Sequence, residues 1–241
     1  MARKKRRTSS EVPQTLVGSD LDNPFFYIKN YRLTEKQKSF AETALDPETK
    51  IMLINGPAGS SKTYMAIYAA LRILAQENGL ELLYVRTIIE SAERNMGILP
   101  GNADEKFNPY MLPLQDKLEE LLKVSDYQRL FQEERINAIP INYLRGANWR
   151  NKIVVADEAQ NFTFQELTTL ITRIGEGTKL FVCGDFMQAD INGKTGYRAM
   201  CDRFSDNESK KMGIHAFKFG IEDIKRSKIL KFIIKRLQET N

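Results

Sequence analysis

Gly56-Pro57-Ala58-Gly59-Ser60-Ser61-Lys62-Thr63 is the stretch that decides the fold of this chain. It follows an apolar run at 51–54 and precedes a helix-compatible run at 64–71. A strand, a glycine-bearing loop, Lys-Thr and a helix together form an arrangement that binds nucleoside triphosphates. Backbone N–H groups of the loop face the phosphates, Lys62 reaches the β- and γ-oxygens, and the Thr63 hydroxyl is placed to bind Mg²⁺. The stretch therefore predicts a site for ATP and Mg²⁺.

One residue of this loop departs from the usual pattern G-x-x-x-x-G-K-[ST]. Ser61 stands where the pattern has its second glycine, so its side chain must point away from the phosphates. The effect on nucleotide affinity is left open. The alternative interpretation is a Gly/Ser-rich turn that happens to precede Lys-Thr. The buried type of strand before the loop and the helix after it favour the phosphate loop.

Length and composition narrow the class of protein. A chain of 241 residues corresponds to about 1.6 average domains, and a hydrophobic fraction of 42% is enough for a core. No run approaches the roughly 20 apolar residues of a membrane span, and no signal peptide is visible, so we expect no membrane partner. Cys183 and Cys201 have no Cys/His cluster around them, which favours a cytoplasmic location and no zinc site. The single histidine, His215, argues against a His-based triad or metal centre.

The positive charge lies at one end of the chain. The net charge is +5, and positions 3–7 are all Lys or Arg. Residues 1–22 lack apolar periodicity and are predicted to be a disordered basic arm, followed by a single domain at 23–241. Such an arm could neutralise nucleic-acid phosphates, or it could serve only as a solubilising tail.

Helix signals give two further expectations. Thr34 can cap a helix that begins at Glu35, and Gln37 completes a capping box. Gln37 thus has two candidate roles, as a helix cap or as a contact to the nucleotide base, and helix chemistry supports only the first. The segment Tyr110–Val124 is amphipathic and should bury leucines at positions 114, 118, 121 and 122.

A second chemical centre follows the apolar run at 152–156, which is typical of a buried parallel strand. Asp157 and Glu158 come directly after it. In a phosphate-loop enzyme, Asp157 is the carboxylate on the Mg²⁺ side and Glu158 can polarise the attacking water. The alternative is a helix N-cap at either residue. The phosphate loop upstream favours the catalytic interpretation.

Three more side chains are placed where a nucleotide could meet them. Arg86 ends a predicted strand at 80–87, and ligands collect at such strand ends in open α/β sheets. Gln188 follows another strand, at 179–183, and could hydrogen-bond the γ-phosphate or the lytic water. Arg226 precedes a basic helix that we predict within 221–237. A planar cation near a subunit edge is what an arginine finger requires.

The order of these motifs resembles the PhoH-like family of phosphate-loop ATPases over most of residues 33–237. The family is similar in its core to superfamily 1 helicases, which implies an α/β fold of RecA-like type. That fold has a mostly parallel central sheet with helices on both faces. The resemblance also implies that Gln37 contacts adenine and that Gln188 senses the γ-phosphate. The matching segments are 56–63, Leu99-Pro100-Gly101, 109–114, Leu144-Arg145-Gly146, 157–161, 172–175, 184–188 and 222–227.

Size suggests how the site is completed. Helicases of that type hold the nucleotide between two RecA-like cores, whereas this chain has residues for one. We therefore expect a homo-oligomer, a head-to-tail ring and most simply a hexamer, with Arg226 inserted into the adjacent site.

The leading functional hypothesis is an ATPase that couples hydrolysis to binding or remodelling of single-stranded nucleic acid. One alternative is a nucleotide-gated assembly or binding module with little turnover, and another is a small-molecule phosphotransferase. These motifs do not encode whether RNA or DNA is the track, whether duplexes are unwound, the polarity of movement or the pathway.

Overall fold

The fold is described from a computed structural model, for residues 26–29, 31–77, 79–87, 103–144, 148–188, 196–225 and 227–238, without the side chains of 103–110 and 238. The predicted arm at 1–22 and the predicted arginine finger, Arg226, lie outside the described residues.

Within these residues, six parallel strands form one sheet in the order β3-β2-β4-β5-β1-β6. Parallel neighbours need crossover connections, and helices supply most of them. The predicted α/β fold with a mostly parallel central sheet is confirmed. The strands are β1 Ile51–Asn55, β2 Glu81–Arg86, β3 Ile136–Pro140, β4 Lys152–Ala156, β5 Lys179–Gly184 and β6 Ile214–Lys218.

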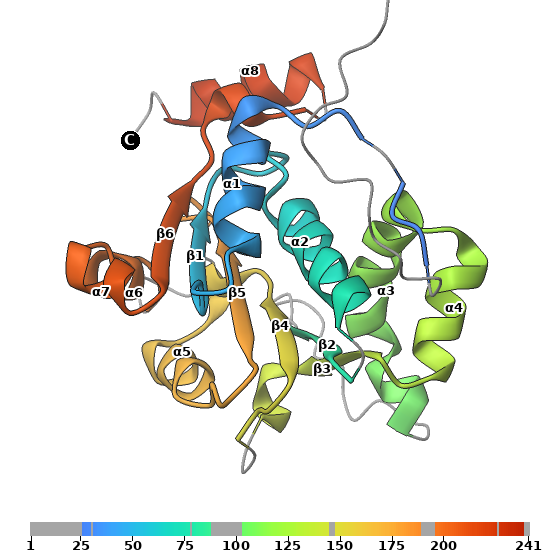
Figure 1. Ribbon diagram of the computed structural model, residues 1–241. Coiled ribbons are helices and arrows are strands. Elements are labelled where there is room, and N and C mark those ends of the chain that lie inside the picture. Colours follow the sequence, from blue (N-terminus) through green and yellow to red (C-terminus); the bar gives the residue numbers. More distant parts are fainter. Residues whose placement is uncertain are drawn as a thin grey trace, which may run out of the picture.

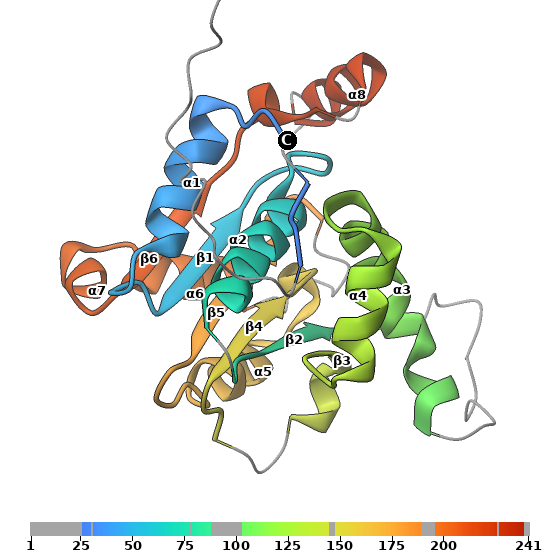
Figure 2. The same ribbon diagram turned by 45° about the vertical axis from the view of Figure 1, so that its right-hand side comes forward.

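Helices cover both faces of this sheet (Figures 1 and 2). One face carries α1 Glu35–Leu45, α2 Lys62–Gln76, α3 Ala103–Leu121 and α4 Val124–Gln132, and the other carries α5 Phe164–Ile171 and α6 Tyr197–Arg203. The remaining helical elements are α7 Asn207–Lys211, α8 Lys228–Gln238 and the 3-10 turns η1 Ile141–Tyr143, η2 Ala159–Asn161 and η3 Ile221–Asp223.

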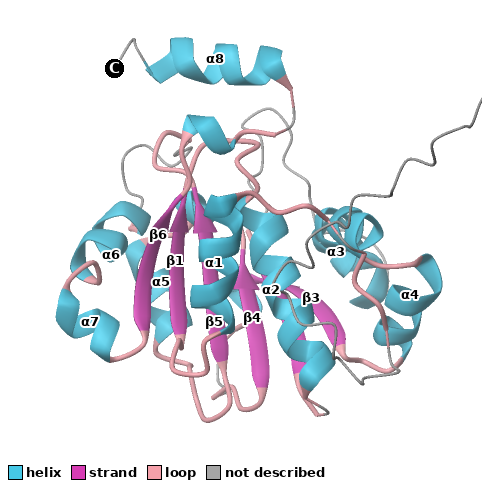
Figure 3. Ribbon diagram, turned by 45° about the horizontal axis from the view of Figure 1, so that its top comes forward, coloured by secondary structure: helices cyan, strands magenta, loops and turns pink. Residues whose placement is uncertain are grey.

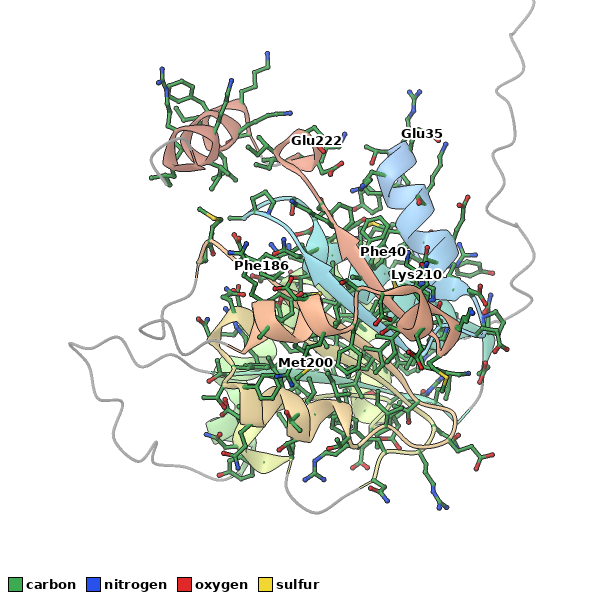
Figure 4. The ribbon with its side chains drawn as sticks, turned by 90° about the vertical axis from the view of Figure 1, so that its left-hand side faces the viewer. Glu35, Phe40, Phe186, Met200, Lys210 and Glu222 are labelled. Carbon is green, nitrogen blue, oxygen red and sulfur yellow. The ribbon has the colours of Figure 1, made fainter. Side chains whose placement is uncertain are left out.

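The period of two along each strand divides the core into two layers. In β1, Met52 and Ile54 belong to the layer beneath α1 and α2, whereas Ile51 and Leu53 belong to the layer beneath α5 and α6. Figure 4 labels one residue of each layer, Phe40 of α1 and Met200 of α6. The leucines predicted to be buried in the segment 110–124 are all fully buried, as expected: Leu114, Leu118, Leu121 and Leu122.

Within the basic segment 221–237, a 3-10 turn, η3, comes first, and the helix predicted after Arg226 is α8, which begins at Lys228. The Asp223 carboxylate accepts a hydrogen bond from the Gly220 N–H at 2.7 Å, which closes η3. The hydroxyl of Ser227 accepts from the Leu230 N–H at 3.1 Å, so α8 begins after Ser227. Two local side-chain bonds therefore stabilise the turn and the start of the helix.

Helix α8 lies beyond the carboxyl ends of the strands, apart from the sheet (Figure 3). Several of its apolar side chains are exposed, namely Ile229, Phe232, Ile233 and Leu237. None of the helices in the described part of the chain is long and apolar enough to cross a membrane.

Candidate nucleotide site

The two predicted motifs meet at the carboxyl edge of the sheet. The Thr63 hydroxyl, at the start of α2, donates a hydrogen bond to Asp157 Oδ1 at 2.7 Å. Asp157 directly follows β4, and its side chain is buried. The two residues are far apart in sequence, so the sheet brings the predicted metal ligands together. The arrangement is RecA-like, because the phosphate loop follows β1, the acidic pair follows β4, and β5 lies between those strands.

The phosphate loop is a tight turn with two left-handed residues. Gly59 has φ 75° and Ser61 has φ 71° with ψ 18°. Ser60 is buried, and its hydroxyl donates to the Pro57 carbonyl at 2.7 Å. A Cβ on Gly56 would lie 2.7 Å from Ser60 Oγ and 2.8 Å from Phe219 Cβ, so this position has no space for a side chain. The position of Ser61 thus has the conformation that a glycine adopts easily, and a serine occupies it.

We expect Ser61→Gly to stabilise the protein by about 0.5–1 kcal/mol. A left-handed conformation costs a non-glycine residue about 1–2 kcal/mol, and part of the gain is lost to the greater chain entropy of glycine. Denaturant unfolding measures the change. Ser39→Gly, in the middle of α1, is the control and should destabilise by roughly 0.5–1 kcal/mol. Equal destabilisation by both changes would contradict the prediction.

The ammonium group of Lys62 lies over the loop. Lys62 Nζ donates to the Gly56 carbonyl at 2.6 Å and to the Pro57 carbonyl at 3.0 Å. The side chain is half-buried, so the charge is held at the mouth of the loop. Its predicted contact with the β- and γ-oxygens requires the ammonium group to exchange these carbonyls for phosphate oxygens.

Glu158 is held by two neighbours. Its backbone is left-handed, with φ 55° and ψ 39°, and its side chain makes no helix-capping hydrogen bond. Arg86 Nη2, at the end of β2, lies 3.6 Å from Glu158 Oε1. Gln160 Nε2 donates to Glu158 Oε2 at 2.5 Å. The Asp157 carboxylate is hydrogen-bonded to side chains of other elements. Neither carboxylate therefore acts as a helix cap.

Gln160 connects this carboxylate to the next strand. Its Oε1 accepts from the backbone N–H of Asp185, directly after β5, at 3.0 Å. The turn beyond Asp185 is fixed by Asn55, whose Oδ1 accepts from the Phe186 N–H at 3.1 Å (Figure 4 labels Phe186). Gln188 closes the same turn, its N–H donating to the Asp185 carbonyl at 3.2 Å, and its side chain is exposed. The turn that carries Gln188 therefore begins at β5, the strand between β1 and β4.

Gln37 makes the predicted capping box. Its Oε1 accepts from the Thr34 N–H at 3.0 Å, and its own N–H donates to the Thr34 hydroxyl at 3.2 Å. The side chain is buried against the fold. The capping role is confirmed, and the contact of Gln37 to adenine stays a prediction.

Two residues with roles at this edge were missed by sequence reasoning. Gln160 lies in the matching segment 157–161, and no role was predicted for it. Tyr84, in β2, is fully buried, and its hydroxyl donates to Asp157 Oδ2 at 2.6 Å. Burial and the negative charge of Asp157 raise the pKa of Tyr84 well above its ordinary value, so the hydroxyl keeps its proton. A tyrosine among aliphatic residues of a buried strand was a usable signal, because a buried hydroxyl needs a partner.

The residues present fit a magnesium ion. Among the described residues, no group of three or more His, Cys, Asp or Glu could form a metal cage. Mg²⁺ in nucleotide sites is usually held by one or two protein oxygens together with phosphate oxygens and water. Thr63 and Asp157 supply two such oxygens beside the phosphate loop.

The segment that leads to Arg226 contacts the same loop. The backbone N–H of Lys225 donates to the Gly59 carbonyl at 3.3 Å. Lys225 is the residue before the predicted arginine finger, whose own position lies outside the described residues.

This chain is similar in sequence to known proteins. A PhoH-like protein from Mycobacterium bovis is 33% identical over 203 residues, covering 83% of this chain and 56% of the relative. Protein PhoH of Escherichia coli K12 is 32% identical over 185 residues, covering 74% of this chain and 50% of the relative. The chain thus spans about half the length of these relatives.

Among solved structures, a crystal structure of Bacteroides sp Pif1 in complex with ADP-AlF4 covers 85% of this chain and 45% of that one. The identity is 18% and the TM-score 0.38. The family profile described as PhoH-like protein matches residues 30–238. This chain therefore belongs to the PhoH-like protein family.

Proposed function

We propose that this protein hydrolyses ATP with Mg²⁺ and couples hydrolysis to binding or remodelling of single-stranded nucleic acid. The observation that carries the ATPase proposal is the hydrogen bond between Thr63 and Asp157, because it joins the phosphate loop to the acidic pair. Membership in the PhoH-like family supports the same conclusion.

In this proposal each residue has one task. Lys62 binds the β- and γ-phosphates, and Glu158 orients a water and accepts its proton. Thr63 and Asp157 hold Mg²⁺, which would neutralise phosphate charge when bound. Gln37 contacts adenine. Gln188, on the turn after β5, senses the γ-phosphate.

The nucleic-acid part of the proposal rests on charge and on position. Helix α8 carries four exposed cations: Lys228, Lys231, Lys235 and Arg236. Cations grouped in this way bind phosphates in a salt-dependent manner. Arg86 lies at the end of β2 and pairs with Glu158. A nucleic acid bound at that strand end could therefore act on the catalytic carboxylate through Arg86.

The test is steady-state ATP hydrolysis with and without single-stranded RNA and single-stranded DNA, with Lys62→Ala as the blank. We expect hydrolysis above the blank and stimulation by at least one polymer. Hydrolysis that is indifferent to both would overturn the nucleic-acid part. Binding of ATP without hydrolysis would favour a nucleotide-gated module, and phosphate transfer to a metabolite would identify a phosphotransferase.

We propose further that the protein works as a closed ring, most simply a hexamer, in which Arg226 of one copy completes the site of its neighbour. The described residues form a single sheet, and a heterologous contact between copies that closes gives such a ring. The exposed apolar side chains of α8 support a partner surface beside the site. Buried area of that kind stabilises association by about 25 cal/mol per Å² before the costs of binding.

Mixing two inactive variants tests whether Arg226 acts across subunits. We expect Arg226→Ala and Lys62→Ala each to be inactive alone, and their co-expression to restore about a quarter of wild-type activity. That fraction arises because an intact Lys62 meets an intact Arg226 at about one interface in four of a randomly assembled ring. ATP hydrolysis of purified mixed particles gives the measurement.

Arg150→Ala, which removes an exposed cation before β4 at the opposite edge of the sheet, is the control and should keep full activity. Absence of recovery in mixed particles would place Arg226 in its own subunit's site or outside the mechanism. A monomer with full ATPase activity in dilute solution would exclude the ring.

A further inference from the structure

The Asp157 carboxylate has a separate partner for each of its oxygens. Thr63 donates to Oδ1 at 2.7 Å and Tyr84 donates to Oδ2 at 2.6 Å. The two donors come from different elements, α2 and β2, whereas Asp157 follows β4. Both oxygens of this carboxylate thus accept a hydrogen bond in a buried environment.

Strand register explains why Tyr84 reaches this carboxylate. Tyr84 pairs with Val155 in the parallel ladder between β2 and β4, two residues before Asp157. Both Tyr84 and Val155 belong to the core layer beneath α2. The long ring of Tyr84 spans the two-residue offset, so its hydroxyl arrives at the strand end where a shorter side chain would not.

A carboxylate without such a partner rotates easily. The terminal torsion of an aspartate is broad and roughly two-fold, so its two oxygens exchange places unless hydrogen bonds distinguish them. The Tyr84 hydroxyl has a donor proton to give at Oδ2, and burial keeps that donor out of water. Oδ1 is then the oxygen that stays beside Thr63 and the phosphate loop.

We infer that Tyr84 is a positioning residue for the metal site: its hydroxyl fixes the rotation of Asp157 and so sets the affinity of the nucleotide site for Mg²⁺. The inference rests on the Mg²⁺-nucleotide part of the proposed function and does not require turnover. In this role Tyr84 acts through Asp157, the residue to which its hydroxyl donates.

Tyr84→Phe removes the hydroxyl and keeps the ring in the core. We expect the Mg²⁺ concentration for half-maximal binding of fluorescent ADP to rise about 10-fold, because partners that orient metal ligands typically contribute that much. Binding of the same ADP probe in excess EDTA should be unchanged. Titration of the full chain with Mg²⁺ at fixed ADP gives the measurement, and hydrolysis plays no part in it.

Tyr197→Phe is a matched control. Tyr197 is also fully buried, and its hydroxyl donates to the Val182 carbonyl at 3.1 Å in the other core layer. Both variants lose one buried hydroxyl, so both should lower the melting temperature, and only Tyr84→Phe should change the response to Mg²⁺. In an Asp157→Ala background, Tyr84→Phe should have no further effect on that response.

Equal Mg²⁺ responses of Tyr84→Phe, Tyr197→Phe and wild type would overturn the inference and leave Tyr84 as a core residue. ADP binding by the wild type that ignores Mg²⁺ would overturn it as well. Normal Mg²⁺-dependent ADP binding without any ATP hydrolysis would overturn the proposed ATPase alone, while the comparison of the two tyrosine variants would still decide the role of Tyr84.

Discussion

Glu158→Gln should lower ATP hydrolysis by about 10²–10⁴-fold while ATP affinity stays within a factor of about two of wild type. The carboxylate is the group proposed to take the proton of water, and a neutral amide has no comparable basicity. The change keeps the size of the side chain and one of its two contacts, because an amide oxygen can still accept from Gln160 Nε2, as Glu158 Oε2 does at 2.5 Å, while the ion pair with Arg86 is lost. Single-turnover hydrolysis and equilibrium ATP binding, measured on the same preparation, check both halves.

A matched control exists at the other edge of the same sheet. Glu81 at the start of β2 forms an ion pair with Lys152 at the start of β4, whereas Glu158 pairs with Arg86 at the carboxyl edge. Glu81→Gln removes the same charge from the same pair of strands and should leave hydrolysis unchanged. Similar losses in both variants would mean that the defect of Glu158→Gln is structural.

Lys62→Ala should weaken ATP binding roughly 10- to 100-fold, because a charge-assisted hydrogen bond contributes about 1.5–3 kcal/mol. Hydrolysis should fall by about 10²–10³-fold at saturating ATP, as when one preorganised donor to the transition state is removed. The ammonium group lies at the loop mouth, 2.6 Å from the Gly56 carbonyl. Titration with a fluorescent ATP analogue and steady-state hydrolysis give the two numbers.

Lys50→Ala is the corresponding control for the loss of a lysine next to β1. Lys50 Nζ donates to the Pro47 carbonyl at 3.0 Å, at the opposite end of the strand from the phosphate loop. This change should alter neither affinity nor rate. If Lys62→Ala bound ATP as tightly as wild type, residues 56–63 would not be a working phosphate loop.

The two variants together separate the competing functions. A loss of binding in Lys62→Ala with retained binding and lost hydrolysis in Glu158→Gln is the pattern of an ATPase. Loss of binding in the first with no measurable hydrolysis in wild type is the pattern of a nucleotide-gated module. The same measurements with Ser61→Gly would show how much the left-handed serine limits affinity.

Local chemistry made much of this site predictable. The phosphate loop, the acidic pair and the capping box are short motifs, whose spacing along the chain encodes their geometry. The placement of Met52 and Leu53 in opposite core layers likewise follows from the two-residue period of a strand between two helical layers. The helix after Arg226 was predicted and is α8, whereas the turn η3 before it was not, because that turn depends on which local side-chain bond forms.

The fold class, the phosphate loop at 56–63 and the acidic residues that would serve it could be predicted from the sequence, because each prediction depends on neighbours along the chain. Three features became visible only in the folded protein: β5 lies between β1 and β4, Tyr84 reaches Asp157, and Arg86 and Gln160 hold Glu158. Strand order and register arise from the packing of distant segments against one another, and parallel neighbours are joined by long crossovers that leave no local trace. Contacts between side chains of different strands follow from that packing, and so they become visible only when the sheet is assembled.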